Sequence, residues 1–118
     1  MRHLIATMFL LSIGATSCYY DNEEELYPFA FCDTQNVSWS QDIRPIIQAR
    51  CATPGCHVTG AQAPDLTTYA GVKQQADAGR IKARVIDRTP SVMPPGGALP
   101  GCDLQQVTAW LAAGAPEN

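Results

Sequence analysis

Residues 51–57 of the chain read Cys-Ala-Thr-Pro-Gly-Cys-His, and this stretch decides how the rest of the sequence is interpreted. Two cysteines flank a four-residue loop, and a histidine follows the second cysteine directly. Pro54 and Gly55 are typical of a tight loop, because proline fixes one backbone angle and glycine adopts angles that other residues avoid. The two thiols and the imidazole are therefore expected to lie close together in the fold.

Three chemistries use two cysteines and an adjacent histidine. Covalent haem attachment usually has two residues between the cysteines, and the four residues here are a rarer spacing in which Cys51 and Cys56 would bind the two vinyl groups and His57 the iron. A zinc site normally adds a fourth protein ligand with similar spacing, and the sequence has no second cluster. A disulfide between Cys51 and Cys56 would leave the histidine without a role. The pattern favours haem.

The first 17 residues are expected to be removed as a secretory signal. A basic start precedes an apolar run over residues 4–13, and small residues follow, which is the layout of a signal peptide. The run is about half the roughly 20 residues that a membrane span needs. Cys18 then resembles the acylated first residue of a bacterial lipoprotein, whereas ordinary cleavage nearby would leave it a spare thiol. Residues 18–36 are expected to form an acidic tether and residues 37–118 the domain.

The five cysteines of the chain divide into one, two and two. Lipidation would use Cys18, and haem attachment would use Cys51 and Cys56. Cys32 and Cys102 remain, and an even pair in an exported protein predicts a disulfide. A domain this small is marginally stable without such a bridge or a cofactor. The formal net charge of −3 argues against nucleic acid as a partner.

Met93 is the candidate second ligand of the iron. Without the signal segment, His57 is the only histidine of the chain and Met93 its only methionine. Cytochromes c bind their haem iron through one histidine and one methionine. Pro94 and Pro95 stiffen the loop behind Met93, so fewer conformations are lost when the thioether binds. The alternative is that Met93 fills the core, which its position in a loop without helical periodicity makes less favourable.

Helical periodicity is the regular pattern of the chain, and no alternating strand pattern is present, so the sequence predicts an all-α fold. The first helix is expected to begin at an Asp42 cap, with Pro45 in its first turn, and to end near Cys51. Three further helices are expected: from a Thr67 or Thr68 cap to about Ala78, over residues 80–87, and over residues 102–113.

Four further side chains each have two interpretations. Trp39, Tyr69 and Trp110 are expected to pack in the core and against a haem rather than to relay electrons. Arg84 precedes the Met93 loop and either pairs with a haem propionate, because guanidinium groups suit carboxylates, or is an exposed residue of its helix.

The order of short segments along the chain resembles small single-haem cytochrome c domains of bacterial lipoproteins, related to the planctomycete-type cytochrome c group. The segments are residues 37–46, 51–57, 66–72, 93–97 and 109–116. The resemblance implies a cytochrome c-like fold of about four helices around one covalently attached haem c, with thioethers at Cys51 and Cys56 and axial ligands from His57 and Met93. The lengthened gap between the cysteines departs from the usual pattern and leaves open which attachment machinery is required.

Two axial ligands leave the iron no site for a substrate, so the expected function is one-electron transfer outside the cytoplasm, without catalysis by this chain. The expected partners are redox proteins, and the membrane through a lipid at Cys18. The sequence has no evident carboxylate pair, Ser–His–Asp set or phosphate loop. If Met93 does not bind iron, a haem-based ligand sensor or a peroxidase-like protein is the alternative. A haem-free surface lipoprotein with a stabilising disulfide is a third possibility.

Overall fold

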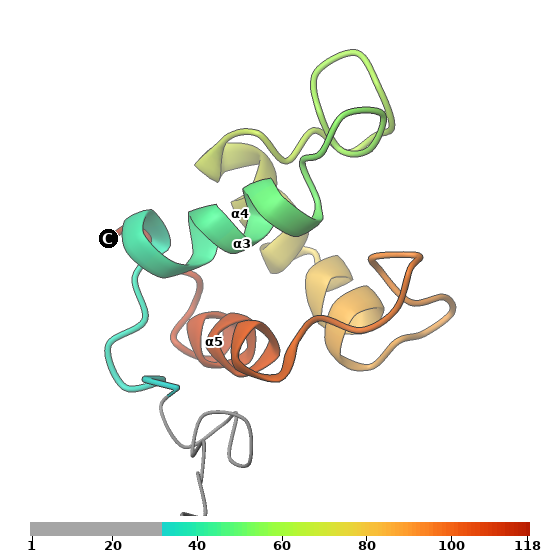
Figure 1. Ribbon diagram of the computed structural model, residues 1–118. Coiled ribbons are helices and arrows are strands. Elements are labelled where there is room, and N and C mark those ends of the chain that lie inside the picture. The colour runs from blue at the N-terminus through green and yellow to red at the C-terminus, as the bar shows by residue number, and fades with distance from the viewer. Residues whose placement is uncertain (1–31) are drawn as a thin grey trace, which may run out of the picture.

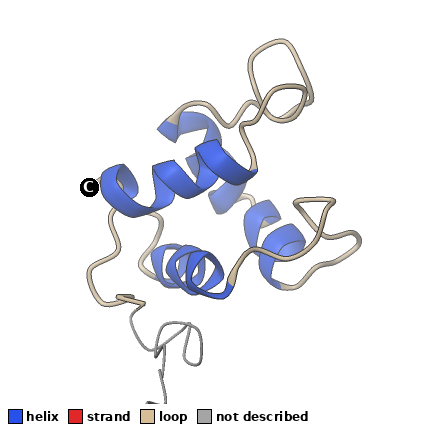
Figure 2. Cartoon of the chain, in the orientation of Figure 1, coloured by secondary structure: helices blue, strands red, loops and turns tan. Residues whose placement is uncertain are grey.

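The computed structural model describes residues 32–118, and over these residues the chain is helical and contains no strand (Figures 1 and 2). The predicted all-α class is confirmed. The expected signal peptide, Cys18 and most of the acidic tether lie outside the described residues. Among residues 32–118, no helix is both long and apolar enough to cross a membrane.

The first helix begins one turn earlier than the sequence predicted. A π-helical segment, η1 (Trp39–Ile43), runs directly into α3 (Arg44–Arg50). Ser38 caps it, because its hydroxyl accepts a hydrogen bond from the Gln41 N–H at 3.1 Å. The predicted Asp42 cap is wrong: the Asp42 carboxylate lies inside the helix and accepts from the Ser38 N–H at 2.7 Å.

Pro45 explains both the wide first turn and the error in its prediction. In η1 the Ile43 N–H donates to the Ser38 carbonyl at 3.1 Å, five residues back, and the Arg44 N–H donates to the Trp39 carbonyl. Proline has no N–H for the carbonyl four residues back, and its ring crowds that carbonyl. A π-helical turn before the proline accommodates both effects.

The other three helices begin and end within a residue or two of their predicted bounds. Thr68 caps α4 (Tyr69–Asp77), and a short helical turn at 80–81 leads into the π-helical segment η2 (Lys82–Ile86). The last helix, α5 (Gly101–Ala112), is followed by Gly114 with a φ of 86°. This left-handed angle favours glycine and ends the helix.

The first and last helices meet through aromatic side chains. The ring of Trp39 lies 5.7 Å from that of Trp110 and 5.2 Å, edge to face, from that of Tyr69. Both tryptophans are buried, and the Tyr69 hydroxyl donates to the Ala115 carbonyl at 2.9 Å. The Trp110 indole N–H donates to the Pro116 carbonyl at 2.9 Å. The two tryptophans therefore belong to the core and Tyr69 packs against it, as expected, and Trp110 and Tyr69 have their polar groups hydrogen-bonded.

The predicted disulfide between Cys32 and Cys102 is present, with Cα atoms 5.5 Å apart and a sequence separation of 70. It ties the segment before η1 to the first turn of α5. The Arg50 side chain at the end of α3 pairs with Asp103 of the same turn at 3.3 Å. The start of α5 is thus held from two sides.

Candidate cofactor site

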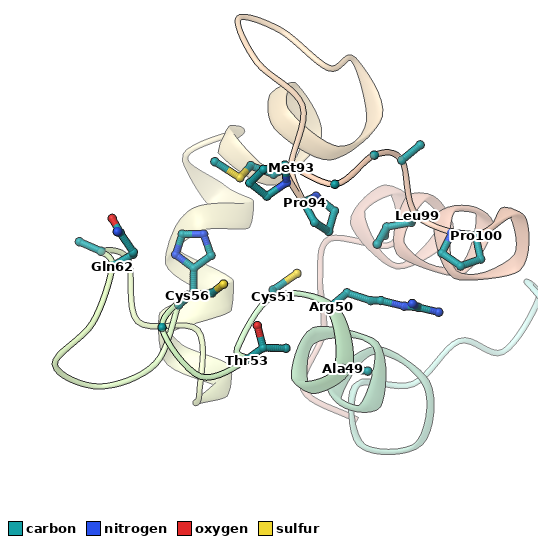
Figure 3. A pocket seen from close by; sticks show the side chains of 17 residues that line it. Ala49, Arg50, Cys51, Thr53, Cys56, Gln62, Met93, Pro94, Leu99 and Pro100 are labelled. Carbon is teal, nitrogen blue, oxygen red and sulfur yellow. The ribbon is translucent and has the colours of Figure 1, made fainter.

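A largely apolar pocket of about 720 Å³ lies between the loop 51–57 and the segment 93–100. Figure 3 shows Cys51 and Cys56 on one side of it and Met93 on the other. Pockets of about 300–1,000 Å³ are typical for small molecules and cofactors. The fold therefore brings together residues that are almost 40 positions apart in the sequence, with a cofactor-sized space between them.

A second pocket, of about 310 Å³, adjoins the first. The two share four lining residues, which are Cys51, His57, Ala63 and Met93. The second pocket reaches inward between α4 and η2, where Gln75, Arg80 and Arg84 contribute polar side chains to its wall. The space around His57 and Met93 thus has two largely apolar chambers, which we call the outer and the inner chamber, and the inner chamber has a polar end that reaches the exposed Arg80.

His57 is held in one orientation by its neighbours. Its Nδ1 lies 3.0 Å from the Pro64 carbonyl oxygen, which can only accept a hydrogen bond, so in the neutral imidazole Nδ1 carries the proton and Nε2 is left with a lone pair. Its backbone N–H donates to the Cys51 carbonyl at 3.1 Å, and its carbonyl accepts from the Leu66 N–H at 2.9 Å. Metal-ligating histidines typically donate their second ring nitrogen to such an acceptor, because that bond fixes the ring and the tautomer.

The two cysteines of the loop are free thiols, so the disulfide alternative is not formed in this structure. Cys56 is exposed and Cys51 is half-buried. Burial, and to a smaller extent the nearby charge on Cys56, raises the pKa of Cys51 from 9.0 to about 11. Cys51 is therefore protonated at neutral pH and a weak nucleophile. Within residues 32–118 no three His, Cys, Asp or Glu side chains gather as a metal-binding group, which gives the zinc alternative no support.

The loop between the cysteines has the predicted turn. The Cys56 N–H donates to the Thr53 carbonyl at 2.9 Å, and Gly55 adopts a φ of 80°. A Cβ at this glycine would have no neighbour within 4 Å, so the backbone angle, and not crowding, is what requires glycine here.

Met93 lines both pockets and also packs against the buried core. Its side chain is half-buried, and its backbone N–H donates to the Arg84 carbonyl at 3.0 Å, which anchors the loop to η2. The loop turns through a hydrogen bond from the Gly97 N–H to the Pro94 carbonyl at 3.1 Å. Met93 thus borders the core and also faces the pocket.

Arg84 is half-buried and lines the inner chamber, and its guanidinium hydrogen-bonds to the Ser91 hydroxyl. Three residues that line the site were not predicted from the sequence: Pro64, Gln75 and Arg80. Pro64 gave no signal, because it acts through its backbone carbonyl. Gln75 did give one: it lies three residues after the buried Val72 and so on the inward face of its helix, where a polar side chain needs a partner.

The segment that carries Pro64 is pressed against α4. A Cβ at Gly71, in the first turn of α4, would lie 2.2 Å from the Asp65 carbonyl oxygen. The Asp65 carboxylate accepts from the Thr59 hydroxyl at 2.6 Å and from the Thr67 N–H at 2.9 Å, and these bonds lower its pKa. The absence of a side chain at Gly71 therefore sets the position of the segment on which the His57 imidazole depends.

Residues 32–118 thus form an all-α domain with a two-chambered pocket, and two free thiols, an oriented imidazole and a thioether line this pocket. Comparison of the chain with protein-family models, curated proteins and solved structures finds no match. The function is therefore argued from the site itself.

Proposed function

We propose that this protein is a monohaem c-type cytochrome that carries single electrons. The observation that carries the proposal is the orientation of His57: its Nδ1 donates to Pro64, so Nε2 is left to bind a metal beside two free cysteines. A thioether from Met93 lines the same pocket. Two thiols, an imidazole nitrogen and a thioether are the groups that attach and ligate haem c.

The residues present fit this group in chemistry and in space. Cys51 and Cys56 would hold the haem through thioether bonds, and His57 and Met93 would be the axial ligands. The outer chamber has the size of a cofactor site and a largely apolar lining. When bound, haem c supplies an iron that accepts and releases one electron. The proposed fold is accordingly cytochrome c-like, with the crossing of the first and last helices behind the pocket.

The chain's own residues favour a carrier over an enzyme. His57 and Met93 would fill both axial positions, so neither would be open to a substrate. Arg84 is proposed to contact a propionate from the inner chamber. The proposal places the protein outside the cytoplasm, anchored in a bacterial membrane by a lipid on Cys18, where it exchanges electrons with redox partner proteins.

The test is expression of the full chain together with a cytochrome c maturation system. We expect a pyridine haemochrome spectrum of haem c, and a peptide spanning residues 51–57 whose mass is increased by one haem. The matched control is the double variant Cys51→Ala, Cys56→Ala, which should carry no covalent haem. Correctly exported protein without haem, whose two thiols are free or joined to each other, would overturn the proposal.

The same material separates the carrier from the alternative function. A weak ferric charge-transfer band typical of methionine-ligated iron supports the carrier. High-spin iron that binds carbon monoxide readily in the unaltered protein supports a ligand sensor or a peroxidase-like protein, because one axial position would then be open.

A further inference from the structure

Gln75 is the one buried polar side chain among the core residues of the described domain, with 5% of its surface exposed. It belongs to α4 and lines the inner chamber. Its Oε1 accepts a hydrogen bond from Arg80 Nη1 at 3.0 Å. Because arginine can only donate, this bond fixes which end of the amide is the oxygen.

The other end of the amide is turned toward the chamber. Within residues 32–118, the bond from Arg80 is the single side-chain hydrogen bond of Gln75, so its Nε2 has no protein acceptor. Each side-chain nitrogen or oxygen of the described buried residues either has a hydrogen-bond partner or is accessible to solvent. The Gln75 Nε2 therefore reaches the open chamber that this side chain lines, and it offers two N–H donors there.

The charge at this end of the chamber is positive and unpaired. Arg80 and Arg84 both line the chamber, and no acidic residue does. Neither arginine belongs to an ion pair of the described residues, whose three pairs are Arg50–Asp103, Lys73–Asp77 and Lys82–Asp87. The polar end of the chamber thus presents amide and guanidinium donors without a protein anion, which is the environment that a carboxylate oxygen fills best.

We infer that Gln75 and Arg80 form a carboxylate-binding site at the inner end of the pocket, with Arg84 as a second guanidinium. The inference rests on the proposed function, in which the carboxylates are those of the haem propionates. It adds Gln75 and Arg80 to the single arginine that the sequence suggested, and it directs the propionate edge toward α4 and η2. Arg80 has two roles, since it binds the carboxylate and also orients the Gln75 amide.

The test uses the haem-loaded full chain with carbon-13 in its propionate carboxylates. The variants are Arg80→Gln and Gln75→Leu, which remove the guanidinium and the amide donors at similar side-chain volume. We expect both to shift the labelled carboxylate band in redox-induced infrared difference spectra. Arg80→Gln should also lower the reduction potential, because a positive charge near the haem favours the ferrous state.

The matched control is Arg88→Gln, which removes the same charge at an exposed residue that lines neither chamber. It should leave the labelled band unmoved. Arg80 is exposed at its helix start, so its variant tests the site even if the buried Gln75→Leu change prevents folding. An unmoved band in Arg80→Gln with a normal haemochrome spectrum would overturn this inference alone. An unaltered chain that matures without covalent haem would overturn both the inference and the proposed function.

Discussion

The two walls of the pocket are built in different ways. The His57 wall is held by a dense set of short-range bonds: the imidazole to Pro64, the backbone to Cys51 and Leu66, and the loop turn at Cys56. The Met93 wall is a loop that is held to η2 by the bond from the Met93 N–H to the Arg84 carbonyl and by the bond between Arg84 and the Ser91 hydroxyl, and one turn stabilises it. The histidine side chain is thus held by its own hydrogen bond, whereas the methionine side chain is positioned by its contact with the core.

Under the proposed function, this difference predicts a division of labour between His57 and Met93 as ligands. A ligand that is already oriented loses little conformational entropy on binding, so the His57 wall is suited to capture. A ligand on a less constrained loop is the one whose bond to the metal is more easily lost. We expect changes in the His57 wall to abolish cofactor attachment, and changes in the Met93 wall to alter the state of the attached cofactor.

The largest expected contrast is between His57→Ala and Met93→Ala in the matured full chain. His57→Ala should remove most of the covalent haem. Removal of only the outer partner of a metal ligand costs ~10- to 100-fold in affinity or activity, and this variant removes the proposed ligand itself. Met93→Ala should keep the covalent haem, convert the iron to high spin, admit carbon monoxide and lower the reduction potential, because methionine ligation raises it. Haem staining after denaturing electrophoresis and the visible spectrum measure both effects. A wild-type spectrum in Met93→Ala would show that Met93 is not the ligand.

The next expected effect comes from the disulfide that fixes α5 beside the Met93 wall. The variant Cys32→Ser, Cys102→Ser opens a loop of 70 residues, for which chain entropy alone corresponds to roughly 4 kcal/mol of unfolding free energy. Covalent haem restricts the same loop, so the loss should be smaller in the haem-bearing protein. Urea unfolding measures the stability, and the low-spin fraction reports Met93. Loss of the haem itself, with Met93 ligation unchanged where haem remains, would contradict the proposed contrast between the walls.

The sign of the change in unfolding free energy caused by Gly71→Ala tests the packing behind the His57 wall. Alanine in an open helical position is favoured over glycine by about 1 kcal/mol. Here the added Cβ would meet the Asp65 carbonyl oxygen at 2.2 Å, so we expect a loss of about 1–3 kcal/mol from overpacking, together with a changed reduction potential as Pro64 and His57 move. The control is Ala70→Gly at the exposed neighbouring position, which weakens α4 without displacing Asp65. A stabilised Gly71→Ala protein would contradict this account.

Local signals in the sequence predicted the helices well. The cap of α4 is Thr68, one of the two threonines that the sequence offered, and α5 ends at Ala112, within a residue of its predicted end. The start of the first helix was predicted wrongly, because Ser38, one turn before Asp42, is its cap. Pro45 favoured the later cap by its usual first-turn preference, although a π-helical turn can accommodate it deeper in a helix.

The site was predictable where residue type carries the chemistry. Cys51, Cys56, His57 and Met93 were all proposed from sequence, and the fold brings them to one pocket. The backbone acceptor of His57 and the close approach at Gly71 could not be predicted from the sequence. Neither the Pro64 carbonyl nor the contact at Gly71 depends on a distinctive side chain. Such features arise from the tertiary path of the chain and leave no pattern in it.

The smallest expected effect concerns Asp65, the outermost anchor of the His57 wall. Hydrogen bonds from Thr59 and Thr67 lower the pKa of this carboxyl below its usual 3.8. The folded state therefore binds the proton less readily than the unfolded state, so the contribution to stability is full above pH 3.8 and is lost as pH falls through the folded-state pKa. Asp65→Asn should remove this dependence, and Thr59→Ala should remove part of it. Urea unfolding over an acid pH series measures the difference.

Because Asp65 is exposed, screening by solvent keeps the effect small. The direct bond between His57 and Pro64 does not involve the carboxylate, so the visible spectrum of Asp65→Asn should match that of the unaltered protein at neutral pH. Unfolding free energies that stay parallel for the two proteins across the acid range would show that the Asp65 bonds do not stabilise the loop. A spectral change in Asp65→Asn at neutral pH would show instead that the His57 wall depends on a single outer anchor, and would contradict the contrast between the two walls.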